Sequence, residues 1–239
     1  PPDYLHKFVD QARELGAEIH IHLSETKGEV ENIKQQYGKS PIALMDEIGV
    51  LDCGCLAAHC VWVDDDDMDI MAAKHVRVAH NPGSNLKLAS GIAPVPKMLA
   101  KGITVGLGTD GASSNNNLDI VEEMRLTTLI HKANTLVIPA ETAINMLTEG
   151  GAKCLGYKDV GKLETGYKAD ITLVDREGLH WYPKNDTLSL MAYSANSMDV
   201  DTVLVNGEVL LRHKEFTKLD IEKIKAEAER TRKKLFAQI

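Results

Sequence analysis

Residues 17–26 read AEIHIHLSET. This short stretch alternates apolar and polar side chains and follows an amphipathic segment, residues 4–15, so the pattern predicts a helix and then a β-strand. With a period of two, His22 and Ser24 lie on one face of the strand and Glu25 lies on the other. His22 and Glu25 can therefore serve one site only if the backbone leaves the strand near Ser24. They then predict a metal ligand beside a proton carrier, although a half-buried histidine and a surface glutamate are the structural alternative.

Three further strand patterns follow, and a helical pattern separates each strand from the next. The predicted strands are residues 17–25, 55–60, 75–82 and 103–111, and the predicted helices are residues 27–37, 41–48, 65–74, 93–101, 118–133 and 139–147. We expect polar loops at residues 81–91 and 113–117, the second of which would cap the following helix. The alternation of strands and helices predicts an α/β fold with a parallel sheet.

The predicted strands end in residues that can carry chemistry, namely Glu25, His59, His80 and Asp110. In β/α barrels the functional residues lie at the carboxyl ends of successive strands. Four such residues at four successive strand ends indicate one shared site at that end of the sheet. The acidic run at residues 64–67 is not counted, because carboxylates in the first turn of a helix complement the helix dipole.

From residue 161 onward the sequence predicts a different architecture. GKLETGYKADITLVD ends in a strand, and DTVLVNGEVLL predicts a hairpin around Asn206-Gly207. Residues 220–239 carry an apolar stripe with basic residues elsewhere, which predicts a packed helix with a solvated basic face. We therefore divide the chain into residues 1–160 and a small antiparallel β portion with a C-terminal helix, residues 161–239.

The composition is that of an ordinary globular protein. The 239 residues are 44% hydrophobic, and their formal net charge of −8 argues against nucleic acid or an anionic membrane as the main partner. No apolar run is long enough to span a bilayer and the N-terminus is not a signal peptide, so we expect a cytoplasmic protein. Four cysteines lack the paired spacing of a structural zinc site and are expected to be reduced, buried thiols: Cys53, Cys55, Cys60 and Cys154.

The order and spacing of four motifs resemble those of a known family. HLSET, AAHC, HNPGSNLKL and GTDGASSNN follow one another as in the second half of the amidohydrolase superfamily barrel. They are most similar to the 5-methylthioadenosine/S-adenosylhomocysteine deaminases and their chlorohydrolase relatives, and GKLETGYKADITLVD resembles the hinge from barrel to small β domain. The resemblance implies the C-terminal half of a (β/α)8 TIM-type barrel with a small antiparallel β appendage and a C-terminal helix.

The resemblance also implies a role for the residues at the strand ends. His22 and Asp110 would bind one catalytic divalent metal, most often zinc, with iron or manganese as alternatives. Glu25 would be the acid/base that contacts the purine edge, Asp110 would also contact the substrate, and His59 would help to deprotonate the attacking water. Three residues of the loop beneath the pocket are expected to be structural: His80, Asn81 and Asn85.

The resemblance is incomplete in one respect. The family's first barrel strand carries an H-x-H pair that supplies two further metal ligands; His20 and His22 have this spacing, but the LSET of the fifth strand follows them. We therefore expect His20 to be a buried neighbour and not a ligand. Because a full barrel needs eight strands in ~250 residues, we expect the N-terminal half to be missing. The chain alone would then bind metal weakly and be inactive.

The implied activity is that of a hydrolase acting on carbon–nitrogen bonds other than peptide bonds, a deaminase of adenosine thioethers that releases ammonia from a purine nucleoside. A bound metal would lower the pKa of water to ~7, His59 and Asp110 would take its proton, and Glu25 would protonate the ring nitrogen and then the departing amine. The alternatives are a guanine or triazine deaminase, a chlorohydrolase, and a metal-free scaffold of the same fold. A homo-oligomer is compatible with the sequence.

Overall fold

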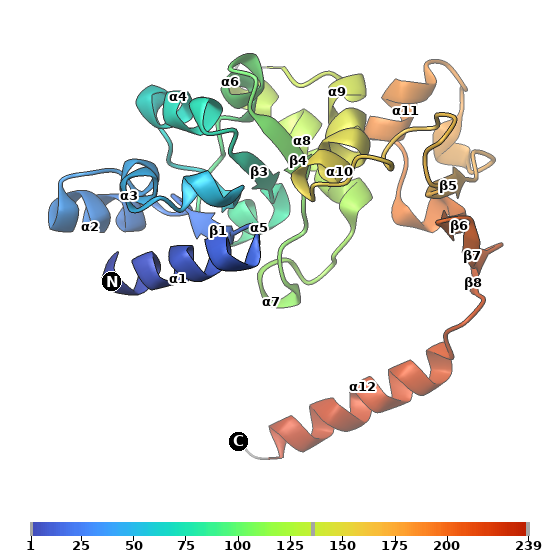
Figure 1. Cartoon of the computed structure of the whole chain (residues 1–239). Coiled ribbons are helices and arrows are strands. Elements are labelled where there is room, and N and C mark those ends of the chain that lie inside the picture. The colour runs from blue at the N-terminus through green and yellow to red at the C-terminus, as the bar shows by residue number, and fades with distance from the viewer. Residues whose placement is uncertain (1, 135–136, 238–239) are drawn as a thin grey trace.

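The computed structural model describes residues 2–134 and 137–237, and its described strands form two sheets of four. The first sheet consists of β1 (His20–Leu23), β2 (Leu56–His59), β3 (Arg77–His80) and β4 (Thr104–Leu107) in that order. Every neighbouring pair in this sheet is parallel. The predicted α/β architecture with a parallel sheet is therefore confirmed, and Figure 1 shows these strands at the centre of the molecule with helices around them.

Helices separate the strands of the parallel sheet and follow its last strand. The helices of the first part are α1 (Pro2–Leu15), α2 (Lys27–Tyr37), α3 (Pro41–Ile48), α4 (Asp65–Ala73), α5 (Pro82–Lys87), α6 (Val95–Ala100), α7 (Ala112–Asn115), α8 (Ile120–Ile130), α9 (Ala140–Asn145) and α10 (Gly151–Cys154). Thr26 and Ser40 accept hydrogen bonds from first-turn N–H groups of α2 and α3. Gly38 and Gly49 end the same helices with a left-handed backbone, so the predicted bounds of both helices are confirmed.

The segment that we predicted as a polar loop at residues 81–91 contains the helix α5. Proline at the first helical position starts a helix as readily as it marks a turn, and Pro82 occupies that position. Ser84 and Asn85 are buried on this helix, because tertiary contacts hold it under the sheet end. The loop prediction was wrong, since composition alone does not distinguish a turn from a short buried helix.

The polar run at residues 113–117 is not the cap that we expected. Part of it belongs to the short helix α7, and α8 begins later than predicted, at Ile120. The cap of α8 is Asp119, whose carboxylate accepts hydrogen bonds from the N–H groups of Val121 and Glu122. The helix predicted at residues 139–147 continues from α9 through a π-helical turn, Met146–Gly150, into α10.

The second sheet is antiparallel, as predicted from residue 161 onward. Its strands are β5 (Ile171–Val174), β6 (Val200–Val205), β7 (Glu208–Arg212) and β8 (Glu215–Phe216). Asn206 and Gly207 both have positive φ, which is the backbone of a tight hairpin turn. The helix α11 (Thr187–Tyr193), which contacts α8 and α9, was not predicted. Nor was the burial of Trp181 in the main core. The division of the chain at residue 160 stays a prediction.

The C-terminal helix α12 (Ile221–Phe236) forms as expected but does not pack on the other residues that the structure describes. None of its described residues is buried, and Figure 1 shows it extending away from both sheets. Asp220 caps its first turn, and ion pairs such as Glu229 with Arg232 lie along its surface. The expectation of a packed helix is wrong here; residues 238–239 of the predicted helix lie outside the described residues.

The cysteines agree with the expectation of reduced thiols. All four are free, and all except the half-buried Cys53 are buried. Burial raises the pKa of the Cys55 and Cys154 thiols to about 11, so these two groups stay protonated at neutral pH. Among the residues that the structure describes, no helix is both long and apolar enough to cross a bilayer.

We expect the replacement Asp64→Ala to lower the free energy of unfolding by about 1 kcal/mol. The Asp64 carboxylate accepts a hydrogen bond from the Asp67 N–H over 3.0 Å, and the Asp67 carboxylate accepts one from the Asp64 N–H over 3.3 Å. Asp66→Ala is the matched control, because it removes only a first-turn charge of α4 worth ~0.3 kcal/mol. Urea denaturation measures both variants, and equal losses would contradict a capping role for Asp64.

Candidate functional site

The chain leaves β1 at Ser24, as the sequence requires if His22 and Glu25 are to share a site. Ser24 has φ of 51°, a left-handed backbone that turns the chain out of the strand. The carboxylate of Glu29, in the first turn of α2, accepts hydrogen bonds of 2.8 Å from the N–H groups of both Ser24 and Glu25. These two bonds hold the turn and direct Glu25 toward the end of the sheet.

His59 needs a similar turn at the end of β2. The register pairs Leu23 with His59 and His22 with Ala58, so regular alternation would place the His59 side chain on the face opposite His22. His59 instead has φ of 71°. Its ring stacks on that of His22, with centroids 5.3 Å apart and planes inclined by 20°.

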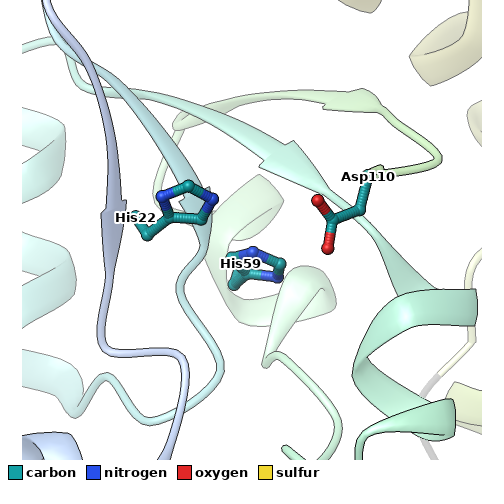
Figure 2. Close-up of side chains that lie close together, drawn as sticks. All are labelled: His22, His59 and Asp110. Carbon is teal, nitrogen blue, oxygen red and sulfur yellow. The ribbon is translucent and has the colours of Figure 1, made fainter. Parts of the chain in front are cut away.

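Asp110, three residues beyond the end of β4, completes the group. One potential ligand atom from each of His22, His59 and Asp110 lies within 4.8 Å of the other two. Figure 2 shows the two imidazoles and the carboxylate directed toward one another. His22 is exposed, Asp110 is half-buried and His59 is only 1% exposed, so the group lies where the buried sheet end meets solvent.

Two hydrogen bonds hold the Asp110 carboxylate. Ser84 Oγ donates to Oδ2 over 2.6 Å and the Gly111 N–H donates to Oδ1 over 2.7 Å. Burial opposes ionisation of this carboxyl, but the two donors and the nearby His59 outweigh it and keep the pKa of Asp110 below its usual value. Asp110 is therefore ionised at neutral pH and can bind a cation.

The two ring nitrogens of His59 face different partners. Nδ1 lies 2.8 Å from Asn85 Oδ1, and Nε2 lies 3.9 Å from Glu25 Oε2. Ser90 Oγ donates to the other carboxylate oxygen of Glu25 over 3.2 Å. Glu25 thus lies beside His59, its side chain 24% exposed, and can reach a molecule bound at the sheet end.

A cavity of about 270 Å³ lies next to this group. The parallel register aligns Ala58, Ala79 and Gly106 in one row with His22, and small side chains in that row leave space beside the imidazole. The residues that line the cavity are His20, His22, Leu56, Ala58, Ala79, Asn81, Gly106, Leu107, Gly108, Asp110, Gly151, Cys154 and Leu155.

Two further histidines near the sheet, His20 and His80, do not belong to the group of His22, His59 and Asp110. His20 was expected to be buried; it is exposed and lines the cavity, because it shares with His22 the face of β1 that borders this space. His80 ends β3 but does not join the group of His22, and it is completely buried. Neither ring nitrogen of His80 has a hydrogen-bond partner among the described residues, and its ring centroid lies 5.8 Å from that of His131.

Three residues that contact the site were not predicted from the sequence, namely Glu29, Ser84 and Ser90. Glu29 was assigned only to a charged helix, although it stands three residues after the cap Thr26, the spacing at which a first-turn carboxylate reaches back to the preceding backbone. Ser84 and Ser90 were assigned only to a loop. Their polar character gave no signal of function, since serine is ordinary in turns.

Comparison with known proteins places these motifs in a family context. The sequence profile of the Amidohydrolase family matches residues 1–210. A protein of Dictyoglomus thermophilum named 5-methylthioadenosine/S-adenosylhomocysteine deaminase is 52% identical over 233 residues, which cover 96% of this chain and 55% of the relative. This chain therefore spans about half the length of that relative.

Solved structures agree with the sequence comparison. An adenosine deaminase from Xanthomonas campestris with bound zinc superposes with a TM-score of 0.95 at 31% identity, covering 99% of this chain and 55% of that structure. A zinc complex of atrazine chlorohydrolase from Arthrobacter aurescens superposes with a TM-score of 0.88 at 29% identity, covering 95% and 51%. Zinc is thus present in two proteins that share this fold.

We expect His22→Gln to weaken zinc binding by more than ~100-fold. Loss of a residue that only hydrogen-bonds a metal ligand already costs ~10- to 100-fold in affinity, and loss of a ligand itself should cost more. The imidazole is one of three groups within 4.8 Å of one another, and glutamine cannot replace its nitrogen as a ligand. Competition with a chromophoric chelator measures the dissociation constant. The control His6→Gln changes an exposed histidine of α1; similar affinities for both variants would exclude His22 as a ligand.

We expect His80 to make the protein less stable in acid. Burial, with His131 and His59 nearby, lowers the pKa of His80 to about 3, whereas the unfolded chain has a histidine pKa of about 6.5. Between these values the unfolded state binds more protons, so the free energy of unfolding falls as the pH decreases from 6.5.

The replacement His80→Leu removes this titration. Between pH 7 and pH 5 the variant should lose about 2 kcal/mol less unfolding free energy than the unmodified protein. His6→Leu, at an exposed position, should leave the pH dependence unchanged. Urea denaturation at the two pH values tests this, and an unchanged slope in His80→Leu would show that His80 is not held neutral.

Proposed function

The chain belongs to the amidohydrolase family, and from this membership we propose that the protein is a metal-dependent hydrolytic deaminase of adenosine thioethers. The observation that carries the proposal is the convergence of His22, His59 and Asp110 within 4.8 Å, with Glu25 at 3.9 Å from His59. A metal-free scaffold of the same fold has no use for two imidazoles and two carboxylates in such proximity. We therefore favour an enzyme.

We also propose that the parallel sheet is half of an eight-stranded β/α barrel. Its four strands are adjacent in sequence order, and the candidate residues come from their carboxyl ends, which is where barrel enzymes carry their sites. The relatives are about twice as long as the region that matches them. Residues 161–239 would then be the portion that follows the barrel.

The residues at the sheet end suit a divalent metal, with zinc the first choice. Catalytic zinc sites combine histidine nitrogens with carboxylate oxygens and leave a position open. His22 and Asp110 are the ligands that we propose, and the position of His59 makes it a third candidate. When bound, such an ion supplies the activation of water for attack at neutral pH.

The residues of this chain would move the protons of the reaction. Water replaces the amino group on the purine ring carbon, and ammonia leaves with the proton that Glu25 delivers. His59 and the ionised Asp110 lie where they can accept the protons of the attacking water. Glu25, adjacent to His59, would protonate the ring nitrogen first and the departing amine second.

The adenosine thioethers 5-methylthioadenosine and S-adenosylhomocysteine are the substrates that we propose, because the relative that is 52% identical is named for their deamination. The likeness to atrazine chlorohydrolase supports a triazine hydrolase as the second candidate. Both reactions displace a group from a nitrogen heterocycle with water, so they can share the metal and the acid/base. They would differ in the walls of the cavity.

Ammonia release separates these candidates. The protein produced from its complete coding sequence is incubated with zinc and with 5-methylthioadenosine, S-adenosylhomocysteine, guanine or a chlorotriazine. We expect release from the two adenosine thioethers. If neither thioether yields ammonia, the proposal is wrong, and release of chloride from the triazine would establish the second candidate.

We expect Glu25→Gln to lower kcat by about 10²- to 10⁴-fold, the usual contribution of a positioned acid or base. Zinc content should not change, because Glu25 is not one of the three clustered groups. Glu31→Gln, on the exposed face of α2, is the control and should retain full activity. A Glu25→Gln variant that keeps its kcat would exclude the proposed proton transfer.

A further inference from the structure

One short segment contacts three side chains to which the proposed function assigns chemistry. Residues 84–90, in α5 and the turn after it, reach across the end of the parallel sheet. The three contacts are those of Ser84 Oγ with Asp110 Oδ2 (2.6 Å), of Asn85 Oδ1 with His59 Nδ1 (2.8 Å) and of Ser90 Oγ with Glu25 Oε1 (3.2 Å). Each contact joins a different strand end to the same segment.

The contacting side chains are buried, which makes their partners important. Ser84 is 0%, Asn85 1% and Ser90 4% exposed. A buried polar side chain that loses its partner keeps the cost of desolvation, about 1–3 kcal/mol. Water therefore cannot readily replace Asp110, His59 or Glu25 as partners, and each bond restrains both of its ends.

The backbone of the segment is itself fixed. The Ser90 N–H donates to Asn85 O over 2.8 Å, and Trp62 Nε1 donates to Ser90 O over 2.6 Å. At the other end, the Gly83 N–H donates to the buried carboxylate of Glu123 over 2.7 Å, which attaches α5 to α8. A Cβ at position 83 would lie 2.3 Å from Glu123 Oε1, so a larger residue there would displace the carboxylate that holds the segment.

The contact with Asn85 has a chemical consequence for His59. An amide oxygen accepts hydrogen bonds only, so Oδ1 at 2.8 Å requires a proton on Nδ1 of the neutral ring. The lone pair then lies on Nε2, the nitrogen that faces Glu25. With the amide reversed, Nε2 would carry the proton and could neither bind a metal nor accept a proton from water.

We propose that Ser84, Asn85 and Ser90 are positioning residues that together orient Asp110, His59 and Glu25 for the reaction. This inference rests on the proposed function for the roles of the three oriented groups. In a purely structural role the segment would only fill space beneath the sheet. Its removal would then lower stability without a specific effect on tautomer, metal affinity or kcat.

The tautomer of His59 is the first test, and it needs neither metal nor substrate. In metal-free protein with ¹⁵N-labelled histidine at alkaline pH, the nitrogen shifts of His59, assigned by their loss in His59→Gln, should show a proton on Nδ1. Asn85→Leu should give a mixture of tautomers, whereas Asn85→Asp, which keeps an acceptor, should preserve the Nδ1–H form. An Nε2–H ring in the unmodified protein, or no change in Asn85→Leu, would overturn the proposal.

Zinc affinity tests the contact with Asp110. In the protein produced from its complete coding sequence, Ser84→Ala should raise the zinc dissociation constant about 10-fold or more, the usual cost of losing a partner of a metal ligand. Ser40→Ala is a matched control, because the Ser40 hydroxyl is also buried and donates to an aspartate, Asp67, in another part of the fold. Equal affinities in the two variants would assign Ser84 to packing alone.

Steady-state kinetics test the contact with Glu25. In the protein produced from its complete coding sequence, Ser90→Ala should lower kcat about 10-fold with little change in KM, and Ser90→Thr, which keeps the hydroxyl, should restore part of the loss. An unchanged kcat in Ser90→Ala would overturn this part. If no thioether is deaminated, the proposed function fails, while the tautomer and zinc results still decide whether Ser84 and Asn85 position their partners.

Discussion

The candidate site depends on a left-handed backbone at the ends of three parallel strands. Ser24, His59 and Asp110 have φ of 51°, 71° and 62°, and a non-glycine residue in this region costs about 1–3 kcal/mol. Such residues persist where surrounding contacts determine them, and here the carboxylate of Glu29 and the N–H of Gly111 supply hydrogen bonds. Without the turns at Ser24 and His59, the alternation of side chains would direct Glu25 and His59 to the face of the sheet opposite His22.

One face of the parallel sheet packs against helices in the core, and the other face borders the cavity of the candidate site. The row of Ala57, Val78 and Val105 is buried among helices, whereas the neighbouring row of Ala58, Ala79 and Gly106 is small and borders the cavity. A shift of the register by one residue would exchange these rows. Core packing therefore determines where the cavity lies and keeps His22 directed toward it.

The comparisons show that one arrangement of strands supports different reactions. An adenosine deaminase and an atrazine chlorohydrolase, both solved with zinc, share the fold of this chain at 31% and 29% identity. Fold alone does not select the substrate. In this chain the imidazole and carboxylate groups at the strand ends carry the proposed chemistry, while the side chains around the cavity would discriminate between a purine and a triazine.

The sequence by itself determined the parallel α/β order, the hairpin at Asn206-Gly207 and the placement of Glu25, His59 and Asp110 at strand ends, because hydrophobic periods and turn residues are local signals. Only the tertiary structure decided that α5 is a helix beneath the site, that His20 is exposed, and that α12 buries none of its described residues. The roles inferred for Ser84, Asn85 and Ser90 depend likewise on contacts between residues up to 65 positions apart. No local pattern encodes such contacts, since they arise only when separate strands align side by side.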